Sequence, residues 1–195
     1  NAMDNKKWSA LHFACQNGNV KTVEFLIAKG MNINSQATDH RTPLHIAAGK
    51  GHASIGKLLL KLLLEKKANL NAGSKIDNKK WTALHFACHN GNVEMVKFLI
   101  AEGMNINSQA TDDKTPLHFA ANNGHVGVVK LLLEKKANLN AIDNKKWTAL
   151  HFACQNGNVK TVEFLIAEGM NINSQTTDHR TPLHIAADNG HVGVV

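Results

Sequence analysis

Side chains suited to chemistry recur in this sequence as histidine–cysteine pairs. In three places a histidine precedes a cysteine by three residues: His12 and Cys15, His85 and Cys88, His151 and Cys154. Residues three apart share one face of a helix, and imidazole and thiolate are both zinc ligands. A zinc site normally needs at least three protein ligands within about 2.3 Å, and the other pairs are too distant to complete a set. We therefore expect no metal site.

A second candidate is the octapeptide GHASIGKL at 51–58, which nearly matches a phosphate-binding loop. Such a loop needs a hydroxyl residue after its lysine to hold Mg²⁺, and Leu58 stands in that place. No strand pattern precedes the segment, so we interpret it as the start of a helix. No cysteine or serine nucleophile has a base outside the repeated pattern described next. The sequence therefore predicts no catalytic residue, no cofactor and no enzyme activity.

The elements that position these residues follow a repeated pattern. Six segments superimpose at intervals of 33, 40, 33, 33 and 33 residues, marked by His12, His45, His85, His118, His151 and His184. A period in this range is typical of a solenoid, in which each unit buries its apolar face on its neighbours. We expect the histidines to belong to this scaffold and to hydrogen-bond adjacent loops.

Each unit has the pattern of a helix, a turn, a second helix and a hairpin loop. In residues 4–36, Ser9 can cap a first helix that ends near Gly18. A second helix begins around Val20 and stops at Gly30, where a positive φ costs little. The polar residues that follow reverse the chain.

A motif at the helix starts points to a known family. Thr-Pro-Leu-His stands at 42–45, 115–118 and 181–184, each time followed by Ile/Phe-Ala-Ala, and two of the three continue to Asn-Gly-His. Recurring in register, this motif resembles the ankyrin repeat over essentially the whole chain. The resemblance implies an all-α solenoid of stacked helix-turn-helix units with projecting hairpin loops, and binding through the hairpin tips and the first helices.

The sequence departs from the ankyrin pattern at two places. The proline of the motif is replaced in alternate repeats by Ala10, Ala83 and Ala149, which should loosen the helix starts only slightly. The glycine expected at each hairpin turn is replaced by Lys7, His40, Lys80, Asp113, Lys146 or His179. Lysine adopts a positive φ poorly, so the sequence leaves the conformation of the tips open.

The predicted organisation is one domain. Residues 1–3 resemble the remnant of a cleaved purification tag, and 4–195 form a single ankyrin-repeat domain. Its six repeats run over 4–36, 37–76, 77–109, 110–142, 143–175 and 176–195, the last one truncated. Neither end carries a polar capping repeat, so we expect either a longer chain or self-association through the uncapped ends.

Two irregularities interrupt or refine the period. The second repeat holds seven extra residues, four from a doubled Lys-Leu-Leu-Leu at 57–64 and three at 73–75. The four add about one helical turn, which nearly preserves the apolar face and can expose extra leucines. Residues 4–48 and 143–187 differ at three positions only, which indicates a recent duplication of a two-repeat block.

Two rows of surface residues are the candidate partner-binding sites. The Trp/cation row is the residue before each first-helix cap: Trp8, Arg41, Trp81, Lys114, Trp147 and Arg180. The polar row lies near the end of each first helix: Gln16, Asn17, Lys50, His89, Asn90, Asn122, Asn123, Gln155 and Asn156. Trp and Arg are enriched at binding hot spots. Alternatively, the Trp/cation row is an internal ladder in which each cation lies on a neighbouring indole, and the polar row is neutral solvent-facing surface.

The overall composition limits the class of partner. With 43% hydrophobic and 19% charged residues the chain is foldable, and no apolar run approaches the roughly 20 residues needed for membrane insertion. The net charge of +7 comes largely from lysine pairs, which are typical of solvated turns. We expect a protein-protein interaction module with a protein partner of unknown identity and disfavour nucleic acid. Nucleic-acid binding by the lysine-bearing hairpins, or a targeting or spacer role in a larger protein, are the alternatives.

The cysteines indicate the compartment. All three stand at the same place in alternate repeats, roughly 20 Å apart if helix layers stack at about 8–10 Å, which is beyond the reach of a disulfide. Reduced core thiols favour a cytoplasmic, reducing location, in the producer or in a host.

Overall fold

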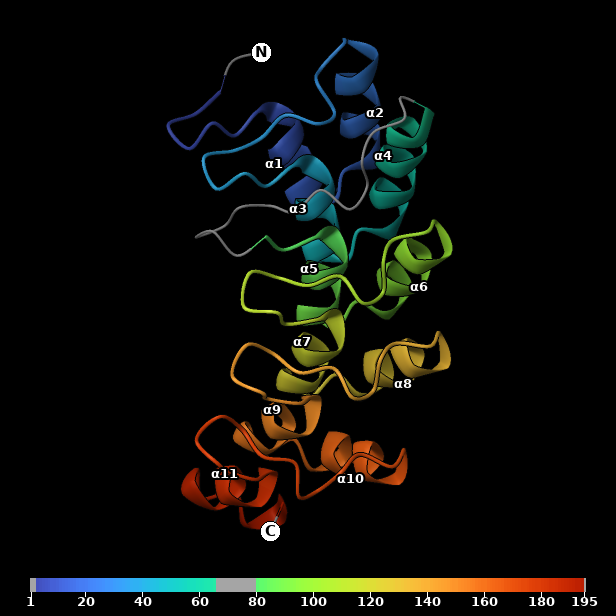
Figure 1. Ribbon diagram of the computed structural model, residues 1–195. Helices are drawn as coiled ribbons and strands as arrows, with labels where there is room; N and C mark the ends of the chain where they lie inside the picture. The colour runs from blue at the N-terminus through green and yellow to red at the C-terminus, as the bar shows by residue number, and fades with distance from the viewer. Residues whose placement is uncertain (1–2, 66–79, 195) are drawn as a thin grey trace. The chain divides into compact units, whose positions relative to one another are not determined.

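The computed structural model describes residues 3–65 and 80–194 (Figure 1). This part of the chain consists of α-helices joined by turns and hairpin loops, and an isolated β-bridge joins Met3 to Ser9. No helix within it is both long and apolar enough to cross a membrane. The all-α prediction is confirmed. The predicted insertion at 73–75 and the repeat junction at 76–77 lie outside the described residues.

Helices alternate between two kinds. The first helices of the repeats are α1 (Ala10–Asn17), α3 (Pro43–Lys50), α5 (Ala83–His89), α7 (Pro116–Asn122), α9 (Ala149–Gln155) and α11 (Pro182–Asp188). The second helices are α2 (Val20–Ala28), α4 (Ala53–Glu65), α6 (Val93–Ala101), α8 (Val126–Glu134) and α10 (Val159–Ala167), and a 3₁₀ turn, η2 (Val192–Val194), follows α11.

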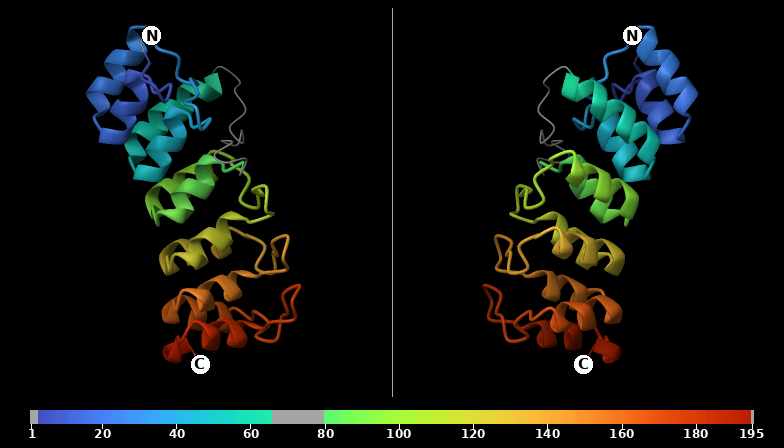
Figure 2. Two further views of the ribbon diagram at one scale, coloured as in Figure 1. Left: turned by 90° about the vertical axis from the view of Figure 1, so that its left-hand side faces the viewer. Right: turned by 90° about the vertical axis from the view of Figure 1, so that its right-hand side faces the viewer.

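The chain divides into two compact units. Unit 1 comprises residues 1–87 and 94–105, and unit 2 comprises 88–93 and 106–195. Within unit 1, α1 packs against α2 and α3, and α4 packs against α2 and α3. Within unit 2, α9 packs against α7, α10 and α11, and α8 packs against α7 and α10. In unit 2 the hairpin loops project to one side of the helices (Figure 2). Each unit is thus a stack of helix pairs.

The core lies between the first and the second helices. Leu117 and Leu150 of the first helices and Leu132 and Leu165 of the second helices are almost completely buried. Alanine also belongs to this core, and Ala153 has no exposed surface. The i, i+3, i+4 spacing of apolar residues predicted from the sequence therefore supplies the buried face.

The start of each first helix is set by its cap. At α9, the backbone N–H of His151 lies 3.5 Å from the Thr148 hydroxyl, and the backbone N–H of Thr148 donates to His151 Nδ1 at 3.2 Å. Pro116 and Pro182 occupy the first turn of α7 and α11, where a missing N–H costs nothing. At α9, Thr148 and His151 thus each provide a side-chain partner for the other's backbone N–H group.

The doubled Lys-Leu-Leu-Leu lengthens one second helix. α4 has 13 residues whereas α8 and α10 each have 9, so the predicted extra turn is confirmed. Leu59, Leu60 and Leu63 are buried, and Leu64 is 42% exposed. In the described part of α4, the extension therefore exposes one leucine rather than a patch.

Candidate protein-binding surface

The period-marking histidines connect each helix start to the chain that follows. The backbone N–H of Ser9 donates to His12 Nδ1 at 3.1 Å, so the neutral ring carries its proton on Nε2, which donates to the Arg41 carbonyl at 3.1 Å. His151 repeats this arrangement with the Arg180 carbonyl at 3.2 Å. Burial lowers the pKa of both rings and keeps them neutral. For His12 and His151, the prediction that the period-marking histidines hydrogen-bond adjacent loops is confirmed.

The cysteines lie inside the same core. Cys15, Cys88 and Cys154 are all free and buried. Burial raises the pKa of the Cys15 thiol to about 12 and that of Cys154 to about 11, and it raises the pKa of Cys88 as well. A protonated, buried thiol is neither a good nucleophile nor a good metal ligand. The histidine–cysteine pairs are therefore parts of the scaffold.

A second set of histidines links neighbouring repeats, and sequence reasoning missed it. His125 Nε2 donates to the His89 carbonyl at 3.0 Å, and His191 Nε2 donates to the Gln155 carbonyl at 3.0 Å. Each ring lies over a glycine of the preceding repeat, where an added Cβ would come within 2.6 Å of His125 at Gly91. The signal in the sequence was the recurrence of Gly at one repeat and His at the next. This recurrence could not be interpreted from the sequence, because the sequence does not show that the glycine and the histidine are in contact.

The six hairpin tips keep the turn conformation that glycine normally provides. The residues there have φ between 50° and 61°, in the order Lys7, His40, Lys80, Asp113, Lys146, His179. All six are exposed. The question left open by the sequence is answered: the tips adopt the left-handed turn although none carries glycine, at a cost of about 1 kcal/mol or more each. The tips therefore present charged or polar side chains to solvent.

Aspartates and neighbouring hairpins hold these tips. Asp143 Oδ1 accepts the backbone N–H of Lys145 at 2.8 Å and that of Trp147 at 2.8 Å, and Asp4 does the same for Lys6 and Trp8. Adjacent hairpins are joined by backbone hydrogen bonds, such as Thr177 N–H to the Lys145 carbonyl at 3.0 Å. The hairpins of a unit thus form a connected edge rather than separate loops.

The tryptophans of the Trp/cation row rest on phenylalanines of their own repeats. Trp8 packs on Phe13 with ring centroids 5.1 Å apart, and Trp147 packs on Phe152 at the same distance. Trp81 repeats the arrangement with Phe86 at 5.2 Å. Each indole is half-buried, so one part of the ring is fixed by packing and the rest is accessible. A pre-positioned, partly exposed indole loses little entropy when it binds a partner.

The cations of the row have a mixed environment. Arg41 lies over the Trp8 ring at 5.5 Å, as the ladder alternative requires, and Lys114 lies over the Phe152 ring at 5.1 Å. Each cation also pairs with an aspartate: Arg41 with Asp39 at 2.7 Å, Lys114 with Asp112 at 2.8 Å, and Arg180 with Asp188 at 2.7 Å. Burial raises the pKa of Asp112, but the hydrogen bond and charge of Lys114 outweigh it and lower the pKa overall. The ladder therefore exists in part, and its charge is largely balanced.

The polar row is partly a hydrogen-bonded ladder within unit 2. The Asn123 amide donates to His89 Nδ1 at 3.1 Å, and the Asn156 amide donates to Asn122 Oδ1 at 2.9 Å. Burial lowers the pKa of His89, and the nearby charge of His125 lowers it further. Other members of the row, Asn17, Lys50 and Asn90, are exposed. Some amides of the row therefore stabilise the stack, and other members of the row are exposed to solvent.

The side chains of the two rows are of types suited to binding a partner. The described part of the chain holds no group of three or more histidine, cysteine or acidic side chains close enough to coordinate a metal ion. It does hold half-buried indoles and ion pairs on the hairpins, and amides near the ends of the first helices. The site residues predicted from the sequence fall into these two rows, and their role in binding stays a prediction.

The sequence was compared with protein families and with curated proteins. A family model described as ankyrin repeats (3 copies) matches residues 1–73, 59–143 and 136–195. Among curated proteins, the chain is 34% identical over 107 residues to transient receptor potential cation channel subfamily A member 1 of Drosophila melanogaster, covering 54% of this chain and 9% of that protein. It is 35% identical over 116 residues to inversin of Canis lupus familiaris, covering 60% of this chain and 10% of inversin.

A third relative has the same proportions. Rabankyrin-5 of Mus musculus is 30% identical over 130 residues, covering 52% of this chain and 11% of that protein. The chain thus spans about a tenth of the length of each of these relatives.

Proposed function

Because the chain belongs to the ankyrin-repeat family, a general protein-protein interaction module, we propose that it binds a protein partner through the Trp/cation row and the exposed part of the polar row. The observation that carries this proposal is the half-buried state of Trp8, Trp81 and Trp147, each seated on a phenylalanine. Aromatic anchors held in one rotamer are the usual centre of a protein interface. The family is typically non-catalytic, and a binding role needs no chemistry from the buried histidines and cysteines.

The charge distribution favours a protein over a nucleic acid. A nucleic-acid surface needs cations free to contact phosphates. The cations of the Trp/cation row are instead paired with Asp39, Asp112 and Asp188. Lysines at the tips, such as Lys7 and Lys146, are exposed and remain the basis of the competing hypothesis. If they bound nucleic acid, a short oligonucleotide would be retarded at low salt and released steeply as salt rises.

The location we propose is a reducing compartment such as the cytoplasm. Three buried, free cysteines support it, because a fold of this kind gains nothing from them in an oxidising compartment. Binding by a segment that targets or spaces the active part of a larger protein is compatible with the same surface.

The proposed surface can be tested by comparison of two triple variants. The 195-residue chain captures its partner from lysate, and the captured protein is then purified and titrated. Trp8→Ala, Trp81→Ala and Trp147→Ala together should weaken binding by at least about tenfold, since each removes an anchor. The matched control changes Lys21, Lys97 and Lys160 to Ala on the second helices, where all three are exposed.

A check that the tryptophan variant is folded must precede the comparison of affinities. The tryptophan variant removes the indole–phenylalanine contacts, so circular dichroism and urea denaturation must first show that it is folded. A folded tryptophan variant with unchanged affinity would sink the site assignment. Equal weakening by the control variant would also contradict it, because the second helices would then share the interface.

A further inference from the structure

Three hairpins of the chain carry the same pentapeptide, and we call them the lysine tips. Asp-Asn-Lys-Lys-Trp stands at 4–8, 77–81 and 143–147, in the first, third and fifth repeats. Its second lysine, which is Lys7, Lys80 or Lys146, has φ between 50° and 60°, where glycine would cost nothing. Backbone strain that persists where a smaller residue would relieve it is typical of positions whose side chain has a function.

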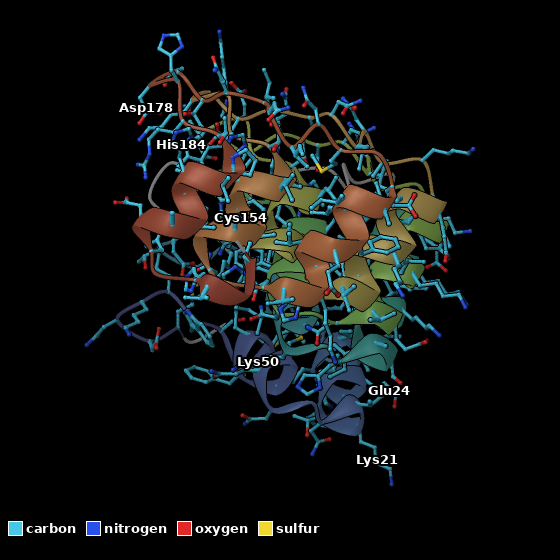
Figure 3. All side chains as sticks on the ribbon, turned by 90° about the horizontal axis from the view of Figure 1, so that it is seen from below. Lys21, Glu24, Lys50, Cys154, Asp178 and His184 are labelled. Atoms are coloured by element: carbon cyan, nitrogen blue, oxygen red, sulfur yellow. The ribbon has the colours of Figure 1, made fainter. Side chains whose placement is uncertain are left out.

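Exposed charges elsewhere in the same repeats are not kept. Lys21 and Glu24 of the first repeat are replaced by Glu94 and Lys97 at the equivalent places of the third. All four side chains are exposed, and Figure 3 shows Lys21 and Glu24 projecting outward from α2. The second helices have therefore exchanged the sign of their charges between two repeats, whereas the lysine tips have not.

The lysine tip at 143–147 is held at every backbone N–H group. Asp143 Oδ1 accepts the N–H groups of Lys145 and Trp147, each at 2.8 Å. The other three N–H groups of the pentapeptide donate to backbone carbonyls at 3.0–3.1 Å. Asp143 is buried, and its carboxylate is thus engaged by the turn. Because the turn is already fixed, little backbone entropy is lost when its side chains bind a ligand.

The two lysines of this tip lack an acidic partner in the part of the chain that the structure describes. Lys145 and Lys146 are exposed, and neither takes part in an ion pair. The residue that follows them, Trp147, is half-buried on Phe152. The tip therefore presents two cations next to the accessible part of an indole. The complementary ligand has carboxylates next to an apolar side chain.

The neighbouring hairpins limit the size of such a ligand. Backbone hydrogen bonds join the hairpin on each side to this tip, and these two hairpins carry Asp112, Asp113 and Asp178. Asp178 lies at the outer edge of the hairpin layer (Figure 3). A nucleic-acid strand carries a phosphate about every 3.4 Å, so a strand running along the hairpins would meet these aspartates. A short acidic cluster that fits a single tip avoids them.

We propose that each lysine tip binds a short acidic segment of a protein. In the fifth repeat the carboxylates of the segment lie on Lys145 and Lys146, and an apolar side chain lies on Trp147. This site rests on the proposed function, because Trp147 belongs to the Trp/cation row. Exposed charge pairs each contribute little, so one tip binds weakly, and a partner with several acidic clusters gains affinity by engaging several tips.

The probe is a fluorescent synthetic peptide, Glu-Glu-Phe-Glu-Glu, and its uncharged match is Gln-Gln-Phe-Gln-Gln. Fluorescence anisotropy measures the binding of each peptide to the 195-residue chain. The glutamate peptide should bind at least about tenfold more tightly than the glutamine peptide, because only the former pairs with the lysines.

A tip variant and a matched control locate the binding. The tip variant changes to glutamine the described lysines of the tips: Lys6, Lys7, Lys80, Lys145 and Lys146. The control changes to glutamine five lysines in or directly after the second helices: Lys21, Lys61, Lys97, Lys135 and Lys160. All ten lysines are exposed, so both variants should fold, as circular dichroism can verify. Both remove the same charge, so long-range attraction falls equally. The tip variant should bind the glutamate peptide about tenfold more weakly, and the control less than about twofold.

Several outcomes would overturn the acidic-segment site. They are failure of the glutamate peptide to bind, equal binding of the glutamine peptide, or equal weakening by the two variants. A short single-stranded oligonucleotide that binds more tightly than the glutamate peptide, and loses this affinity in the tip variant, would assign the tips to nucleic acid instead.

The captured partner distinguishes this site from the proposed function. If the tryptophan variant loses the partner and the tip variant binds it with wild-type affinity, the proposed function stands and the acidic-segment site fails. A folded tryptophan variant with unchanged affinity contradicts the proposed function, whatever the peptides do.

Discussion

At the scale of single residues, burial decides what the titratable groups can do. His118 is buried, its Nε2 donates to the Ala141 carbonyl at 3.0 Å, and burial lowers its pKa to about 4. The ring is therefore neutral at physiological pH and acts as a rigid connector between helix start and loop. The role of the His118 ring is therefore structural, and this role should make the stability of the protein depend on pH.

Acidification should destabilise the chain through His118. Above pH 6.5 the ring is neutral in both the folded and the unfolded chain, so its contribution is constant. Between pH 6.5 and about 4, only the unfolded chain takes up the proton, and the free energy of unfolding falls by about 1.4 kcal/mol per pH unit for this residue. His12 and His151, whose pKa values burial also lowers, add to the slope. Urea denaturation at pH 7.5, 6, 5 and 4.5 measures it.

The contribution of His118 is isolated by substitution. His118→Gln removes the titrating group, so it should lower stability at pH 7.5 and flatten the pH dependence by close to one proton. Asn156→Ala, which removes an amide of the polar row that donates to the non-titrating Asn122, should lower stability while keeping the wild-type slope. An unchanged slope in His118→Gln would show that the ring is not responsible.

The histidine–glycine contacts between repeats make a second prediction. Gly91→Ala and Gly103→Ala both place alanine at a positive φ, 74° and 84°, which costs about 1 kcal/mol in each case. At Gly103 a Cβ meets nothing within 4 Å, but at Gly91 it would lie 2.6 Å from the His125 ring. Gly91→Ala should therefore cost about 1–2 kcal/mol more, because the ring must move and release the His89 carbonyl.

A double-mutant cycle checks the cause. If the excess comes from the His125 ring, the background His125→Ala should remove it, leaving Gly91→Ala and Gly103→Ala equal in urea denaturation. An excess that persists without the imidazole would assign it to the backbone instead.

At the scale of the elements, the hairpin tips hold non-glycine residues at a positive φ, which costs conformational free energy that the helices do not incur. Lys146 has φ of 60° where the family pattern places glycine. Lys146→Gly should raise the free energy of unfolding by up to about 1 kcal/mol, since glycine adopts this conformation without a Cβ penalty. Lys145→Gly, one residue earlier and without positive φ, should instead leave stability unchanged or lower it slightly. Both variants remove one lysine, but only Lys146→Gly relieves a positive φ. Chemical denaturation of the two variants therefore distinguishes relief of backbone strain from loss of repulsion between lysines.

Lys146→Gly also tests whether the hairpin tips take part in binding the partner. Strained backbone tends to persist where function needs the side chain. If the tips take part in binding, Lys146→Gly should be more stable than wild type and yet bind the captured partner less tightly. A variant that is more stable with unchanged affinity would place the interface on the first helices alone.

The elements were predictable because their signals are local. Helix starts at Thr-Pro-Leu-His, the ends at Gly18 and Gly30, and the extra turn of α4 each follow from residues adjacent in sequence. What the sequence could not supply was which side chain reaches which neighbour. Lys114, for example, lies over Phe152 of the next repeat, a contact between residues 38 apart in the sequence. The conformation of the tips was left open for a related reason: cross-hairpin hydrogen bonds outweigh a local preference.

At the scale of the whole molecule, the two-repeat block is the unit of construction. Residues 4–48 and 143–187 differ at three positions, so interfaces of one kind recur along the chain. In such an array stability is close to a sum of repeat terms and nearest-neighbour terms. Deletion of a two-repeat block should therefore be tolerated if the two repeats that it brings together form an interface of a type that is present in the intact chain.

Deletion of 110–175 tests this additivity. The cut joins Gln109 to Thr176, and the preceding Asn107-Ser108-Gln109 has the same sequence as Asn173-Ser174-Gln175, which leads into Thr176 in the intact chain. The third repeat would then contact the sixth as α9 contacts α11. Removing 66 of 195 residues leaves 129, so the denaturant m-value should fall to about two thirds while the helical circular dichroism per residue is retained. Deletion of 110–158 removes one and a half repeats and joins the third hairpin directly to α10, so it should abolish cooperative unfolding. If both deletions fold equally well, the register of the repeats does not govern stability; if both fail, the interfaces are specific to their places and the block is not interchangeable.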